Sequence, residues 1–134
     1  MKISTHSEMF QEWLRSKLAV EPLPIKGSVV VSHEYKKHLG ARSLYAKVVI
    51  SAKSAEEFSF ISKAKWQNED YTQAVFEGLL DVLFSYYRAP ILKGAFVLEE
   101  IGWHDIDSAE IAFYRSARMA TIGILNETGY SSFE

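Results

Sequence analysis

Apolar and polar positions alternate with different periods along the chain, and the first period is helical. Apolar residues recur at helical spacing between Phe10 and Leu18, behind a capping box made by Thr5 and Glu8. The pattern predicts a first helix from Ser7 to Ala19. Two prolines in the next few residues end this helix, because proline lacks an amide donor and restricts the residue before it.

The next segments have the alternation and β-branched content of strands. A first strand is predicted from Gly27 to Leu39, and residues 45–51 alternate as a second strand after a loop at 40–43. These two strands form a hairpin whose tip carries Arg42. Residues 58–64 are aromatic and β-branched, which predicts a third strand that completes an antiparallel meander.

Helical periodicity then returns twice, on either side of a fourth strand. Asn68 is the predicted N-cap of a long, largely buried helix that ends near Tyr87. The fourth strand covers residues 94–101. Asp107 and Glu110 give a second capping signal, followed by a stripe of small residues suited to close packing on a sheet.

The order β-β-β-α-β-α predicts an α+β domain, a four-stranded sheet with helices packed on one face. We expect an N-terminal helix and proline-containing linker at residues 1–27, the α+β domain at 28–125, and a frayed tail at 126–134. The chain has 134 residues, which is enough to bury one core without metal or disulfide support.

Two loops carry a resemblance to a known family. The chain has Gly-Ala-Arg-Ser-Leu-Tyr at residues 40–45 and Gly-Trp-His-Asp-Ile-Asp-Ser at 102–108. They resemble the Gly-Gly-Arg-Gly-Gln-Tyr-Gly and Tyr-His-Asp-Val-Asp-Ser loops of domain IV in the translation elongation factor G family. The resemblance covers residues 28–124. It implies a left-handed β-α-β crossover and a tip, formed by both loops, that meets small-subunit ribosomal RNA.

Charge and composition limit the functions that fit this chain. The net charge is -2 and the sequence pI is near 6.1, whereas a dedicated nucleic-acid binder is usually basic, with a pI above about 9. Lysines crowd the first hairpin nevertheless, and only Glu34 opposes them there. The chain has no cysteine, no apolar run long enough for a membrane span, and no secretory signal. We therefore expect a cytoplasmic protein.

The predicted RNA contacts lie in the two loops and in the basic hairpin. Arg42 offers a forked donor to phosphate, or pairs with a neighbouring aspartate, and His104 either contacts RNA or orders its own loop. Trp103 is the aromatic side chain expected at the contact. The remaining candidates are Lys36, Lys37, Lys47 and Asp105.

Catalysis is not expected from these residues. His104 and Asp105 lie close to Asp107, but Asp107 is already explained as a helix cap and a metal site needs three or more converging ligands. The chain also lacks a Gly-x-x-x-x-Gly-Lys-Ser/Thr loop, so we expect no nucleotide hydrolysis, cofactor or enzymatic activity. The alternative function is a protein-interaction or self-association module that uses the first helix and an exposed sheet face.

Overall fold

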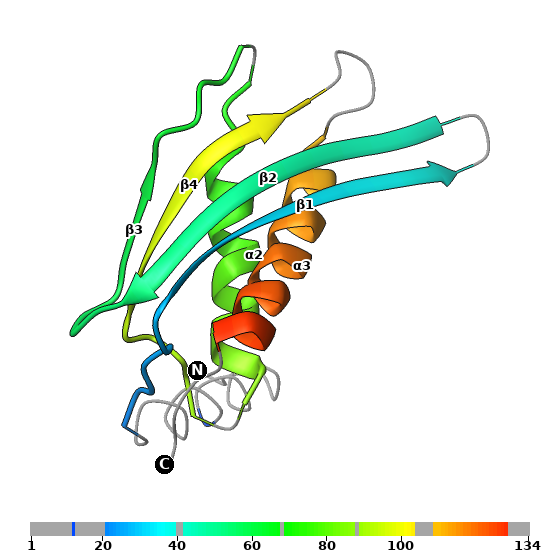
Figure 1. Ribbon diagram of the computed structural model, residues 1–134. Helices are drawn as coiled ribbons and strands as arrows, with labels where there is room; N and C mark the ends of the chain where they lie inside the picture. Colours follow the sequence, from blue (N-terminus) through cyan, green and yellow to red (C-terminus); the bar gives the residue numbers. More distant parts are fainter. Residues whose placement is uncertain are drawn as a thin grey trace, which may run out of the picture.

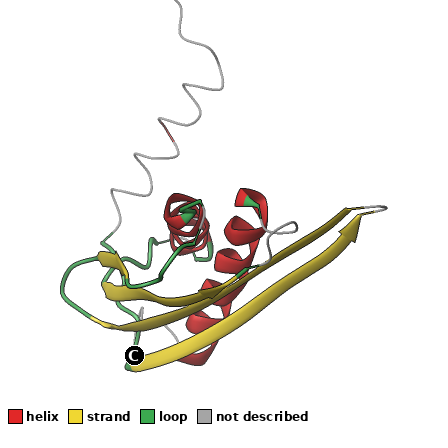
Figure 2. Ribbon diagram, turned by 90° about the horizontal axis from the view of Figure 1, so that it is seen from above, coloured by secondary structure: helices red, strands yellow, loops and turns green. Residues whose placement is uncertain are grey.

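A four-stranded sheet with two long helices on one of its faces forms the body of the molecule (Figures 1 and 2). The computed structural model describes residue 12 and residues 21–39, 42–67, 69–87, 89–103 and 109–128. The elements are β1 (Ser28–Leu39), β2 (Arg42–Ser54), β3 (Ser59–Ser62), α2 (Thr72–Ser85), β4 (Gly94–Gly102) and α3 (Glu110–Thr128). The predicted α+β class is confirmed.

The strand order is β1-β2-β4-β3, so the predicted antiparallel meander is wrong. Strand β3 does not pair with β2. It pairs in parallel with β4 at the edge of the sheet, with Phe60 opposite Phe96. Parallel neighbours need a crossover connection, and α2 provides it between β3 and β4.

The β3-α2-β4 connection has the left-handed sense that the family resemblance implied. Figure 1 shows β3 and β4 running in the same direction with β4 to the right of β3, while α2 passes behind the sheet. Figure 2 confirms that both helices lie behind that same face. A chain that rises in one strand, descends behind the sheet and returns on the right follows a left-handed path, the rare hand for this unit.

The core lies between the sheet and the two helices. Alternate residues of β2 face the helices and are almost fully buried, including Ala46, Val48 and Ile50. The predicted stripe of small residues on α3 is confirmed, because Ala112, Ser116, Ala117 and Ala120 are all buried. The hydroxyl of Ser116 also donates to the carbonyl oxygen of His33 at 2.9 Å, which ties α3 to β1.

Several predicted boundaries move. Helix α2 begins at Thr72 with Tyr71 at its N-cap, so Asn68 is not the cap. The carboxylate of Asp70 instead accepts a hydrogen bond from the Thr72 amide at 2.8 Å. Strand β2 continues to Ser54, and α3 runs to Thr128, three residues into the predicted tail.

The chain before β1 is partly built into the body. Ile25, predicted in the linker, is buried with 1% of its surface exposed, and the Leu23 amide donates to the carbonyl oxygen of Pro90 at 2.8 Å. Of the predicted first helix, only Glu12 is described, and it is helical. The rest of that helix and Trp13 lie outside the described residues.

Trp66 packs where α2 and α3 begin. Its ring meets Phe113 edge-on with centroids 5.0 Å apart, and its indole nitrogen donates to the hydroxyl of Thr72 at 3.0 Å. Tyr71 stacks on Phe113 from another side, at 5.3 Å. These rings fix the beginning of α2 against the beginning of α3.

Candidate nucleic-acid interface

Strand pairing brings residues 42–45 of the first resemblance loop and Gly102, where the second begins, to the same end of the sheet. In β4 the last residue, Gly102, lies opposite Lys47 of β2, and Lys47 lies opposite Glu34 of β1. Beyond this row, β1 and β2 continue as a two-stranded arm, defined here as residues 35–39 and 42–46. Arg42 is five residues past Lys47, so the arm extends about 16 Å beyond the end of β4 at about 3.3 Å per residue.

The arm is well packed at its base and exposed farther out. Leu44 and Tyr45 are 8% and 9% exposed, whereas Lys36 and Lys37 are both exposed. Because strand side chains alternate, Lys36 lies on the face of the sheet without helices and Lys37 on the face that carries them. The predicted lysines therefore occupy both faces of the arm.

Two of the other predicted contact residues, Lys47 and Trp103, are partly buried. Lys47 is partly buried on the helix-free face, at the row where β4 ends. Trp103 is partly buried against the core, so it is less available for base stacking than a free loop aromatic. The backbone of Arg42 pairs with Leu39. The Arg42 side chain, His104, Asp105, Asp107 and the turn at residues 40–41 lie outside the description.

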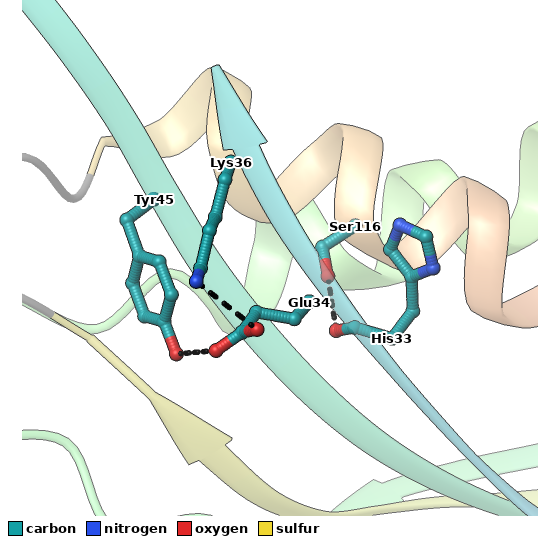
Figure 3. A network of polar contacts seen from close by, with 5 residues as sticks. All are labelled: His33, Glu34, Lys36, Tyr45 and Ser116. Carbon is teal, nitrogen blue, oxygen red and sulfur yellow. Dashed lines mark hydrogen bonds and ion pairs between the residues drawn. The ribbon is translucent and has the colours of Figure 1, made fainter. Parts of the chain in front are cut away.

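Glu34 is the centre of a polar network at the base of the arm (Figure 3). Its carboxylate accepts a hydrogen bond from the Tyr45 hydroxyl at 2.6 Å and lies 3.6 Å from the ammonium of Lys36. The Tyr45 hydrogen bond lowers the pKa of Glu34, with help from the charges of Lys36 and Lys47. Burial and the bond to Glu34 raise the pKa of Tyr45 to about 12, so the phenol remains a donor at neutral pH.

Gly102 gives this network room beside the second loop. A Cβ at this position would lie 3.1 Å from the Cβ of Lys47 and 3.4 Å from the hydroxyl oxygen of Tyr45. The side chains of Lys47 and Tyr45 thus pass directly over the backbone where β4 ends. The base of the arm and the start of the loop after β4 are one packed unit.

Lysines are distributed unevenly over the fold. No described lysine lies on α2 or α3, and α2 carries Glu77 and Asp81 without a basic residue. The lysines lie on strands and loops: Lys26, Lys36, Lys37, Lys47, Lys53, Lys63, Lys65 and Lys93. Helix α3 contributes two arginines, Arg115 and Arg118, so the helices are not free of positive charge, but every described lysine lies outside them.

Sequence reasoning missed an apolar row on the helix-free face. Val30, Ser51, Val97 and Ile61 are successive partners across all four strands, in the order β1, β2, β4, β3. Val30 is 65% exposed and Ile61 is 55% exposed. A shallow depression of about 480 Å³ lies beside this row, with Lys53 and Lys63 in its lining. The sequence shows the alternation within each strand, but it does not show the strand order that brings these four residues into one row.

Within the described ranges, no three histidine, cysteine or acidic side chains converge where a metal ion would fit. None of the helices in the described part of the chain is both long and apolar enough to cross a membrane.

Comparison with known proteins shows a shared fold with solved structures. No family model matches the chain, and no curated protein matches it. Among solved structures, the crystal structure of ttk003000868 from Thermus thermophilus superposes with a TM-score of 0.75 at 21% identity, over 81% of this chain and 17% of that one. The likeness shows a shared fold, and this chain spans about a sixth of that protein's length.

Proposed function

We propose that this protein is a non-enzymatic domain, similar to domain IV of elongation factor G, that binds the ribosome or structured RNA through its arm and the loop after β4. The observation that carries the proposal is the two-stranded arm, which projects beyond β4 with Lys36 and Lys37 on opposite faces. Lysines on both faces of a narrow projection suit an RNA groove, because the phosphates of the two RNA backbones would lie on either side of an inserted arm. The proposal places the protein in the cytoplasm.

Two lysine pairs provide a matched test of the RNA proposal. The double variant Lys36→Ala, Lys37→Ala should bind purified small ribosomal subunits more weakly, with a log-log salt slope smaller by about 2, because each lysine that contacts a phosphate contributes about one unit. Filter binding across a salt series measures both quantities. The control is Lys53→Ala with Lys63→Ala, which removes the same charge from exposed sites on strand β2 and just past β3.

The control pair separates a local site from general charge. Lys53 pairs with Ser28 and Ala95, far from the row where β4 ends. Equal losses in both double variants would mean that only net charge matters. Binding that is unchanged in the Lys36 and Lys37 variant would remove the arm from any RNA contact.

A second function has its own supporting observation, the exposed apolar row on the helix-free face. Val30 and Ile61 lie at the two edge strands of that row, and the neighbouring depression has lysines beside apolar groups. We propose as the alternative that this face associates with a second copy of the chain, with the predicted amphipathic segment at residues 7–19 as its occupant. From Phe10 to Leu18 such a helix is about 12 Å long, close to the width of four paired strands, about 14 Å.

Charge substitution in the row tests this alternative. Val30→Glu with Ile61→Glu should abolish any concentration-dependent increase in mass seen by light scattering, because a carboxylate cannot be buried unpaired in an apolar contact. Ile111→Glu with Met119→Glu is the matched control, since those side chains are 43% and 47% exposed on α3. A wild-type chain that stays monomeric at high concentration would exclude self-association.

A further inference from the structure

Glu34 occupies the position at which an anionic ligand would meet the lysines of the helix-free face. Lys36 lies two residues along β1 on the same face, and Lys47 is the cross-strand partner of Glu34. The carboxylate lies 3.6 Å from the ammonium of Lys36, and its negative charge also partly offsets the positive charge of Lys47. Together the three side chains carry a net charge of only about +1 at neutral pH.

We propose that Glu34 is a built-in competitor for RNA phosphate, held between Lys36 and Lys47 by the hydroxyl of Tyr45, and that it limits the affinity of the arm for RNA. This inference rests on the proposed RNA-binding function. It adds a residue that sets how tightly the site binds, and it assigns opposite effects to neighbouring side chains: the lysines favour the ligand and Glu34 opposes it.

The hydrogen bond from Tyr45 makes Glu34 a fixed competitor. A surface ion pair between mobile side chains is weak, and Lys36 and Glu34 are 67% and 45% exposed. The Tyr45 side chain, by contrast, is largely buried and its hydroxyl donates at 2.6 Å, which restricts the carboxylate to one place. An incoming phosphate must displace the Glu34 carboxylate from Lys36 or bind beside it, and both cost affinity.

The competitor should also be present across the physiological pH range. The hydrogen bond from Tyr45 lowers the pKa of Glu34, and a lowered carboxylate pKa favours the charged form. The groups that act on it are Tyr45, Lys36 and Lys47, together with the neighbouring His33, which interacts electrostatically with Glu34. Protonation of His33 in mild acid adds a positive charge and so favours the charged carboxylate. Mild acidification is therefore not expected to release it.

The test compares two carboxylates that have the same kind of hydrogen bond. Glu34→Gln retains an acceptor for Tyr45 but removes the negative charge. The variant should bind a fluorescently labelled RNA stem-loop about three- to fivefold more tightly at low salt. This factor corresponds to removing the repulsion between the carboxylate and a phosphate about 5 Å away in water. Glu99→Gln is the control, because Glu99 accepts from the Ser51 hydroxyl at 2.6 Å, away from the arm. Fluorescence anisotropy over a salt series provides affinity and salt slope.

The outcomes distinguish this inference from the function on which it rests. Tighter binding by Glu34→Gln alone supports the inference. Equal gains in Glu34→Gln and Glu99→Gln, or no gain in Glu34→Gln while the Lys36 and Lys37 variant binds more weakly, would overturn it and leave the RNA proposal standing. If neither the lysine variant nor Glu34→Gln changes RNA binding, the RNA proposal itself fails.

Tyr45→Phe separates position from charge. This variant keeps the carboxylate but removes its hydrogen bond, so affinity should rise less than in Glu34→Gln. A gain as large as that of Glu34→Gln would show that the position of the carboxylate, and not its charge, limits binding. That result would overturn the electrostatic explanation.

Discussion

Replacing Phe113 with alanine should lower the free energy of unfolding by about 3 to 5 kcal/mol, the usual cost of removing a buried aromatic ring. The Phe113 side chain has no exposed surface and lies at the start of α3. Its ring contacts Trp66 at 5.0 Å and stacks on Tyr71 at 5.3 Å. The variant loses the apolar burial and leaves a cavity where α2, α3 and the segment around Trp66 meet.

Urea denaturation followed by circular dichroism measures this loss. Met119→Ala is the control within the same helix, because Met119 is 47% exposed and its truncation should change stability by less than about 0.5 kcal/mol. If Phe113→Ala cost no more than Met119→Ala, the described packing at the start of α3 would be incorrect.

Gly78→Ala should destabilise the protein by about 2 kcal/mol, although alanine is normally favoured over glycine in a helix by about 1 kcal/mol. An added Cβ would lie 2.4 Å from the backbone carbonyl oxygen of Tyr114 and 3.1 Å from the Cβ of Ala117. Backbone atoms cannot rotate away, so α2 and α3 would have to separate. Because Tyr114 also bonds to Asp81 of α2, this movement would disturb a second contact between the helices.

A second helical glycine provides the matched control. A Cβ at Gly123 of α3 would meet only Cγ1 of Val31, at 3.2 Å, and a side chain can adjust. Gly123→Ala should therefore be much less harmful than Gly78→Ala, as judged by the urea midpoint of each variant. A stabilised Gly78→Ala would mean that the two helices are farther apart than described.

The sequence predicts most elements of this fold, but local patterns do not determine how the strands pair. Alternation located β1, β2 and β4 because each has one face against the helices. Strand β3 has only four residues, and consecutive strands usually pair, which favoured the wrong meander. The family resemblance implied a β-α-β crossover, and the pairing of Phe60 with Phe96 agrees with it.

The candidate site was predicted in part. Its lysines and the two loops follow from the sequence, as does the opposition between Glu34 and those lysines. The contact of Glu34 with Tyr45 depends on the register of the hairpin, which places Tyr45 opposite Lys36. Local patterns in the sequence do not reveal that register. They also do not reveal that Val30 and Ile61 lie in one row across the four strands.

Because β1 and β2 project beyond Gly102, the two ends of this strand pair differ in how much bending would disturb the core. Next to β4 and the helices, bending either strand would disrupt the core. In the outer part of the arm, beyond the buried Leu44, β2 no longer pairs with β4, so a change of twist there would disturb few buried contacts. In the complex that we propose, a change of angle in the outer part of the arm would therefore leave the buried core unchanged.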